Sequence, residues 1–186
     1  MVGDLCKRFR NDTTVGIAYI YCSFKRKHEQ TLEDLLLNLL KQLAQSQSSL
    51  PNSVRGLYEC HQQKKTRPLF EEVCKALRSV AAMCSSVFIV VDALDECQTS
   101  VGCRTRFLEE IFSLQAKYGA NIFATSRIND EIAKIFIGAS SLNIYATNDD
   151  VRAYLDERML LQQSDILDDD IRNMIKRNII EATDGM

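Results

Sequence analysis

Three stretches of the chain carry runs of apolar residues without the alternation that a half-exposed strand would show. They are VGIAYIYCSF at 15–24, VFIVV at 87–91 and ANIFATSR at 120–127. An unbroken run rich in β-branched and aromatic residues is typical of a strand that is covered on both faces. The pattern therefore predicts three buried strands, and SLNIYA at 141–146 predicts a fourth.

Between these runs, apolar positions recur every three or four residues, as they do on one face of a helix. The clearest case extends from Leu32 to Leu43, with Thr31 placed to cap the helix and Asp34 three residues later. The same spacing predicts further helices at 2–9, 54–63, 69–84, 104–118 and 129–136.

This alternation of helices and strands predicts an α/β fold, a parallel sheet with helices on both faces. Residues 1–147 would form that core. No strand pattern follows residue 147, and two helical stretches predict that residues 148–186 are the start of a helical subdomain.

The composition is that of a globular protein, with 46% hydrophobic and 26% charged residues. Its 23 basic and 25 acidic side chains are well mixed and leave a net charge of -2, so we expect no nucleic acid partner. No apolar run reaches the roughly 20 residues of a membrane span, and no signal peptide is visible. We therefore expect a cytoplasmic protein without a membrane partner.

The seven cysteines form an odd number and include no CxxC pair. In a chain of this composition, that pattern indicates reduced thiols, several of them small core residues.

Polar side chains follow two of the predicted strands at their carboxyl ends, which is where open parallel sheets bind ligands. These candidate site residues are Asp92, Asp95 and Glu96 after one strand, and Thr125, Ser126 and Arg127 at the end of the next.

An Asp that follows four or five apolar residues is how phosphate-binding enzymes hold Mg²⁺, and Asp92 has this place. Capping of the following turn is the alternative role. Asp95 and Glu96 favour the metal, because grouped carboxylates repel one another unless a cation or hydrogen-bond donors lie close. Arg127 is either a solvated charge or a sensor of a γ-phosphate.

VFIVVDALDECQ, NIFATSR and SLNIYATNDDVRAYL closely resemble segments of the NACHT nucleotide-binding domain. The likeness is to the nephrocystin-3-like N-terminal type, which precedes ankyrin or other repeats in fungal proteins. The resemblance implies a STAND-class P-loop ATPase, a signalling switch that is closed with ADP and assembles with ATP. It implies Mg²⁺ with ATP or ADP as cofactor. The implied partners are other NACHT domains and a repeat domain in the parent protein.

By this resemblance, Asp92 would be the Walker B ligand of Mg²⁺, and Asp95 and Glu96 would position or activate water. Arg127 would be the sensor, with Thr125 and Ser126 beside it as cofactor-binding residues. Ala93 stands where fast relatives carry a catalytic Glu, which implies slow hydrolysis.

One family motif, GxxxxGK[ST], is absent, since none of the seven glycines is followed by Lys. We expect that this loop and its strand lie upstream of Met1 in a longer protein, and that the strand belongs between 120–127 and 141–146. Without the loop, no backbone cradle holds the phosphates. The 186 residues alone should therefore bind nucleotide weakly or not at all, and an unpaired strand edge should favour aggregation.

Three other interpretations stay open. The chain could be a scaffold that keeps the fold without a nucleotide. It could be a metal-dependent phosphohydrolase that uses the three carboxylates, although position 94 is Leu and the DxD pattern is missing. It could also carry a catalytic thiol, with Cys97 or Cys22 acting beside His28.

Overall fold

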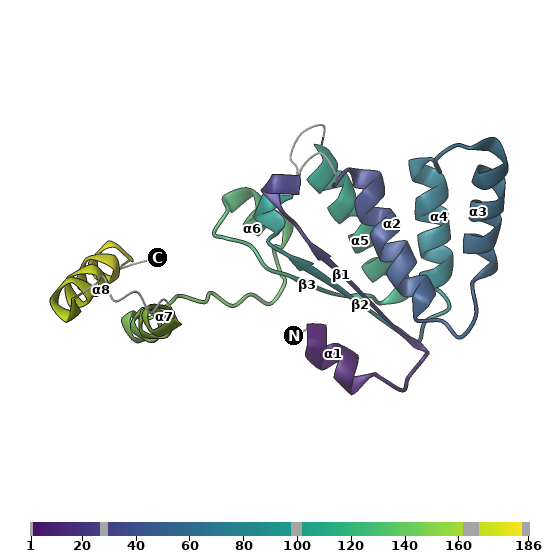
Figure 1. Cartoon of the computed structure of the whole chain (residues 1–186). Coiled ribbons are helices and arrows are strands. Elements are labelled where there is room, and N and C mark those ends of the chain that lie inside the picture. The colour runs from purple at the N-terminus through teal and green to yellow at the C-terminus, as the bar shows by residue number, and fades with distance from the viewer. Residues whose placement is uncertain (1, 27–29, 98–101, 162–167, 184–186) are drawn as a thin grey trace. The chain divides into compact units, whose positions relative to one another are not determined.

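A computed structural model describes residues 2–26, 30–97, 102–161 and 168–183 (Figure 1). Its contacts divide the chain into two compact units, 1–137 and 138–186. The first unit carries the sheet and the candidate site. Within the described residues, no helix is long and apolar enough to cross a membrane.

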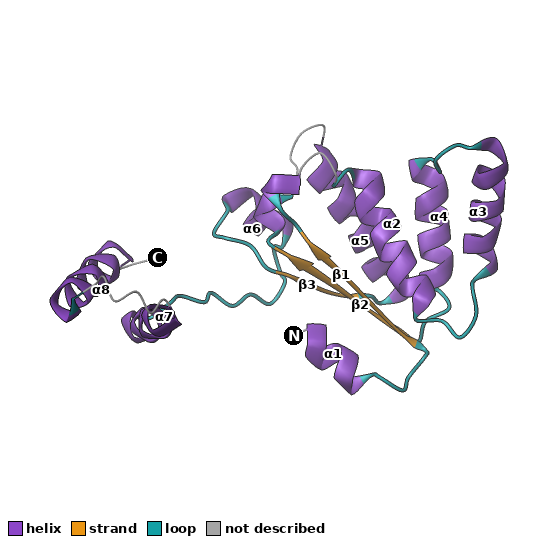
Figure 2. Ribbon diagram, in the orientation of Figure 1, coloured by secondary structure: helices purple, strands orange, loops and turns teal. Residues whose placement is uncertain are grey.

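The sheet of the first unit has three parallel strands, drawn in orange in Figure 2. They are β1 (Val15–Tyr21), β2 (Ser86–Asp92) and β3 (Asn121–Ala124), in the order β1-β2-β3. Tyr21 pairs with Asp92, and Val91 pairs with Ala124, so the carboxyl ends of all three strands lie together at one end of the sheet. The predicted α/β fold with a parallel sheet is confirmed.

One face of the sheet carries most of the core, as Figure 1 shows for the layer formed by α2 (Leu32–Gln45), α4 (Phe70–Ala81) and α5 (Cys103–Tyr118). These helices bury leucines and other apolar side chains against Ala18, Ile20, Ile89 and Val91. Each fully buried leucine contributes about 1.5–3 kcal/mol. The remaining helices of this unit are α3 (Asn52–Lys64), which packs on α4, and the short α1 (Val2–Arg8) and α6 (Asp130–Ile135).

The opposite face of the sheet is only partly covered. Phe9, just after α1, stacks on Phe88 of β2 with ring centroids 5.3 Å apart. Tyr19 and Tyr21 of β1 and Phe123 of β3 remain 38%, 57% and 47% exposed. The sequence-based prediction that β1 and β3 are covered on both faces is therefore wrong for these side chains.

The outer edge of β1 is closed by two glutamine side chains. Gln42 of α2 accepts a hydrogen bond from Tyr19 N–H at 3.0 Å and donates one to Tyr19 C=O at 2.8 Å. Gln30 donates to Tyr21 C=O at 2.8 Å and accepts from Ser23 N–H at 3.0 Å. Each amide thus takes the place of a neighbouring strand.

The outer edge of β3 has no such cover among the described residues. Thr125 directs its backbone groups towards β2, donating to Val91 C=O at 2.9 Å and accepting from Leu94 N–H at 2.8 Å. Successive residues of a strand face opposite sides, so Ile122 and Ala124 present their backbone groups outwards. No described side chain bonds to those groups, and this edge is open.

The second unit contains α7 (Asn148–Leu161) and α8 (Asp169–Thr183), joined by an ion pair between Lys176 and Asp156. The predicted strand at 141–146 is wrong, because residues 141–147 have no regular secondary structure. Leu142 and Ile144 are 82% and 84% exposed. A strand needs a neighbour for its backbone groups, and no described strand pairs with this segment.

Candidate functional site at the ends of two strands

The turn after β2 is fixed to the end of β3. Ala93 N–H donates to Thr125 Oγ1 at 2.9 Å, and Leu94, which begins η2 (Leu94–Glu96), is fully buried. Ala93 has a φ of 53°, in the left-handed region that favours glycine. A small residue is therefore favoured directly after Asp92, and a larger side chain there would add strain.

Asp92 is half-buried at the carboxyl end of β2 and is held by Thr125. The hydroxyl of Thr125 donates to Asp92 Oδ1 at 2.5 Å while it accepts the hydrogen bond from Ala93. Among the described residues, no hydrogen-bond donor meets Asp92 Oδ2. The structure therefore places one carboxylate oxygen in a fixed position and leaves the other able to accept a ligand.

Asp95 and Glu96 both meet the side chain of Arg127. Arg127 Nε lies 2.7 Å from Asp95 Oδ2, and its backbone N–H donates to Asp95 Oδ1 at 3.1 Å. Arg127 Nη2 lies 3.5 Å from Glu96 Oε1, and Glu96 Oε2 accepts from Phe24 N–H at 3.1 Å. The cation that faces these two carboxylates is thus one of the chain's own residues.

Asp95 and Arg127 stabilise each other's charged form. The side chain of Asp95 is only 13% exposed, and that burial raises its pKa, but the hydrogen bonds from the side chain and backbone of Arg127 hold the pKa below its usual value. The hydrogen bond to Asp95 in turn raises the pKa of Arg127, whose side chain is 78% exposed. The pair is therefore ionised at neutral pH and can be reached from solvent.

The candidate residues form two groups at the carboxyl ends of β2 and β3, and the members of each group contact one another. Asp92 contacts Thr125, while Asp95 and Glu96 contact Arg127. The hydroxyl of Ser126 donates to the backbone C=O of Arg127 at 2.6 Å, and among the described residues it bonds to none of the three carboxylates. Sequence reasoning missed the role of Thr125 as the partner of Asp92, which the parallel register of β2 and β3 could have indicated. It also missed the backbone N–H of Phe24, for which the sequence carries no signal.

The donor set fits Mg²⁺ at one position. Among the described residues, no three His, Cys, Asp or Glu side chains are grouped so that they could hold a metal ion by themselves. Nucleotide-bound Mg²⁺ needs only one or two carboxylates, because water and phosphate oxygens supply the other ligands. Asp92 meets this requirement through Oδ2, whereas Asp95 and Glu96 are already paired with Arg127.

The cysteines are all free thiols, and four of them are buried: Cys22, Cys74, Cys97 and Cys103. A hydrogen bond with Cys103 lowers the pKa of Cys97. A hydrogen bond with Cys22 and the burial of the thiol outweigh this effect and raise the pKa to about 12. This thiol is therefore protonated at neutral pH, which opposes a nucleophilic role. His28, its suggested base, lies outside the described residues.

The three parallel strands and the helices that pack on them define the chain as an α/β protein. The family model for the nephrocystin 3 N-terminal domain matches residues 2–127, which is more than half of the chain. The chain belongs to this family. The match ends at Arg127 and therefore includes every candidate site residue. None of the curated proteins matches the chain.

Proposed function

We propose that this chain is part of a NACHT-type, nucleotide-dependent signalling switch that binds ATP or ADP with Mg²⁺ at the carboxyl ends of β2 and β3. The main support is Asp92, which stands at the end of a buried strand with one carboxylate oxygen fixed by Thr125 and the other open. Membership of the nephrocystin 3 N-terminal family is consistent with this role.

In this proposal, Asp92 holds Mg²⁺ through Oδ2, directly or through water. A Mg²⁺ ion held there would supply positive charge that offsets the charge of the phosphates. Arg127 would exchange its carboxylate partners for a phosphate oxygen, since guanidinium binds both groups in the same forked geometry. Asp95 and Glu96 would then hold a water molecule by its protons. Ala93 contributes no base, so hydrolysis would be slow.

The open edge of β3 is where we propose that a further strand pairs, bringing the phosphate-binding loop that the 186 residues do not contain. Phe123 is half-exposed and the outward backbone groups of Ile122 and Ala124 have no described partner, so this edge can accept a strand. Association with other NACHT domains and a repeat domain in the parent protein belongs to the same proposal.

A scaffold that keeps this fold without a nucleotide is the second candidate. It is favoured by the ion pairs of Arg127, which neutralise Asp95 and Glu96 with the chain's own cation. Under this alternative, the acidic turn only fixes the end of β3 against the turn after β2.

Titration with fluorescent ATP and ADP distinguishes the two candidates. We expect weak or undetectable binding to the 186 residues, and Mg²⁺-dependent binding when the in-frame genomic sequence upstream is included. Asp92→Ala should then weaken binding by about tenfold or more in Mg²⁺, while the exposed Asp130→Ala should not. Equal binding by Asp92→Ala would remove the assigned metal role, and no binding by the longer protein would favour the scaffold.

A further inference from the structure

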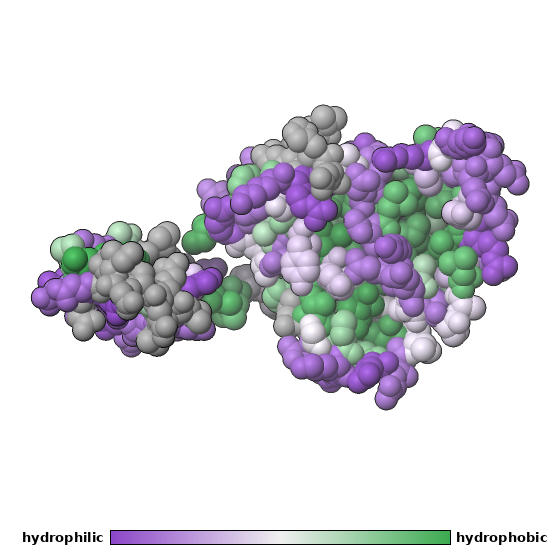
Figure 3. Space-filling view, in the orientation of Figure 1, coloured by the Kyte–Doolittle hydropathy of each residue, from purple (hydrophilic) through white to green (hydrophobic). Residues whose placement is uncertain are grey.

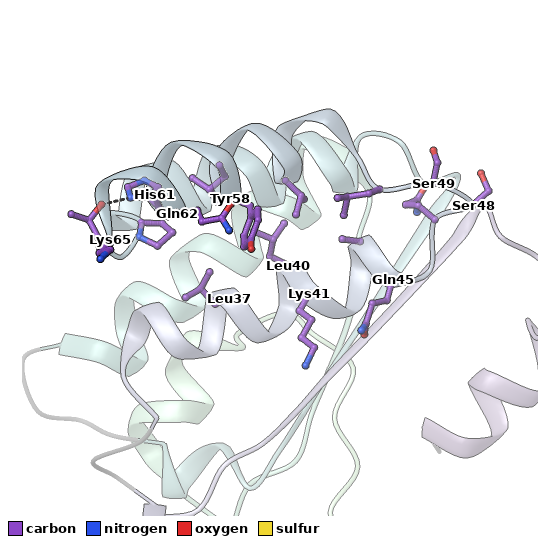
Figure 4. A pocket seen from close by; sticks show the side chains of 17 residues that line it. Leu37, Leu40, Lys41, Gln45, Ser48, Ser49, Tyr58, His61, Gln62 and Lys65 are labelled. Atoms are coloured by element: carbon purple, nitrogen blue, oxygen red, sulfur yellow. Dashed lines mark hydrogen bonds between the residues drawn. The ribbon is translucent and has the colours of Figure 1, made fainter.

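A second candidate site is a groove of about 730 Å³ between α2 and α3, away from the acidic turn (Figure 4). Both helices pack on α4, and they contact each other little, which leaves the groove between them. In the space-filling view, hydrophobic atoms show between hydrophilic surfaces in the region of α2, α4 and α3 (Figure 3).

Each wall of the groove is a regular helical stripe. Residues at positions 37, 40 and 44 of α2 are two leucines and an alanine, and α3 adds Val54, Leu57 and Tyr58. Tyr58 is 62% exposed, and Leu50 in the link between the helices is 51% exposed. Leu40 and Ala44 are themselves buried, so the apolar surface open to solvent comes from Leu50, Tyr58 and the partly buried Leu37, Val54 and Leu57. Exposed apolar surface of this kind can mark an interaction site.

His61, near the carboxyl end of α3, holds α3 in place at that end of the groove. One ring nitrogen, Nε2, lies 2.9 Å from Glu72 Oε2 on α4, and the other, Nδ1, lies 2.8 Å from Thr66 Oγ1. Glu72 also accepts from Leu69 N–H at 2.8 Å. These bonds tie α3 to the start of α4, so the groove exists before any partner arrives.

The lysines are the charged side chains that line the groove, apart from His61. None of its lining residues is Asp or Glu, whereas Lys41 of α2 and Lys65 just after α3 line it and are exposed to solvent. His61 also lines it, but its ring already faces the carboxylate of Glu72. A partner with basic groups would therefore meet like charge, and one with carboxylates would be complementary.

We propose that the groove between α2 and α3 binds an acidic amphipathic α-helix of a partner protein. Its walls are helices of 14 and 13 residues, about 20 Å long, so a partner helix of similar length fits between them. Apolar side chains spaced three and four residues apart would enter the groove, as in other helix-in-groove complexes. Carboxylates beside them would face Lys41 and Lys65.

Selection from a phage-displayed library of helical peptides, each as long as α2, tests the proposal. The chain is the bait, and the Lys41→Glu/Lys65→Glu variant is the counter-selection. We expect enriched peptides with apolar residues at helical spacing and acidic residues beside them. Failure to enrich any peptide that the variant does not also bind would overturn the proposal, as would enrichment of basic or extended sequences.

Fluorescence anisotropy with an enriched peptide then measures affinity. Lys41→Glu/Lys65→Glu should weaken binding about tenfold or more, and Tyr58→Ala should weaken it several-fold. The matched control Lys75→Glu/Lys117→Glu reverses two exposed lysines outside the groove and should leave the affinity within about twofold. Equal losses in both double variants would mean that only net charge matters, and would contradict the groove.

Sedimentation of the same proteins covers another occupant. If the chain dimerises and Lys41→Glu/Lys65→Glu alone abolishes the dimer, the groove is an interface between copies of this chain and the proposal is wrong. A monomer whose peptide binding depends on the two lysines supports it.

Discussion

The two outer edges of the sheet differ in how their backbone groups are satisfied. On β1, Gln42 and Gln30 bond to the groups that point away from the sheet, whereas no described side chain does so on β3. A closed edge blocks further pairing, and an open one invites it. The difference indicates that the sheet is closed to a further strand at Tyr19 and Tyr21 of β1 and can extend at the outer edge of β3.

Proline substitutions should separate the two edges most strongly. Tyr19→Pro removes the N–H that donates to Gln42, and should lower the free energy of unfolding by about 3 kcal/mol. Ala124→Pro removes an N–H that points outwards from an edge strand, where proline is tolerated, and should cost about 1 kcal/mol or less. Urea unfolding measures both, with Tyr19→Val as the control for the lost ring. Equal costs would contradict the contrast.

Gln42→Leu tests the closed edge itself. It keeps the bulk of the side chain but leaves the backbone groups of Tyr19 to water, so the free energy of unfolding should fall by about 1–2 kcal/mol. Gln63→Leu, on the exposed side of α3, is the matched control and should change it little. The assignment fails if the two variants unfold alike.

At the turn after β2, which Thr125 holds to the end of β3, we expect stability to depend on the backbone of Ala93. Ala93→Gly should raise the free energy of unfolding by about 0.5–1 kcal/mol, because glycine adopts a φ of 53° without strain. Ala93→Val should lower it by about 1–2 kcal/mol. Thermal unfolding of the two variants checks the order, and a stabilising valine would show that the turn is not strained.

Removing Arg127 should have the smallest effect on stability, and one that depends on pH. Because the pKa of Asp95 is lowered in the folded chain, its ion pair stabilises the fold above about pH 4, and this contribution is lost as the pH falls through the folded pKa. Arg127→Gln should destabilise the folded chain slightly at pH 7, and less near pH 3. Urea unfolding at both pH values would detect the change, and a cost that grows towards acid would have the wrong sign.

Elements that rest on local chemistry could be predicted from the sequence. Thr31 and Asp34 form the expected capping box, with Asp34 N–H donating to Thr31 Oγ1 at 3.2 Å and Thr31 N–H donating back to Asp34 Oδ2 at 3.3 Å. The strand that ends at Asp92 was also expected. The segment at 141–146 was mispredicted because a strand depends on a neighbour, and a pattern of apolar residues does not reveal one.

The candidate site divides in the same way. Asp92 and Thr125 lie close together because β2 and β3 are parallel and their carboxyl ends meet, and that part was predictable. The direct pairing of Asp95 with Arg127 depends on the left-handed turn at Ala93, which aims η2 towards the end of β3. Side-chain partners across a turn are set by its backbone angles, and the sequence alone does not give them.

Amide hydrogen exchange at the two edges tests the central claim most directly. For the 186-residue chain, Tyr19 N–H should exchange at least about 100-fold more slowly than the amides of Ile122 and Ala124, which should be near the rate of an unfolded peptide. Protection of Ile122 and Ala124 equal to that of Tyr19 would show that the edge of β3 is already closed, and would contradict a sheet that can extend at β3.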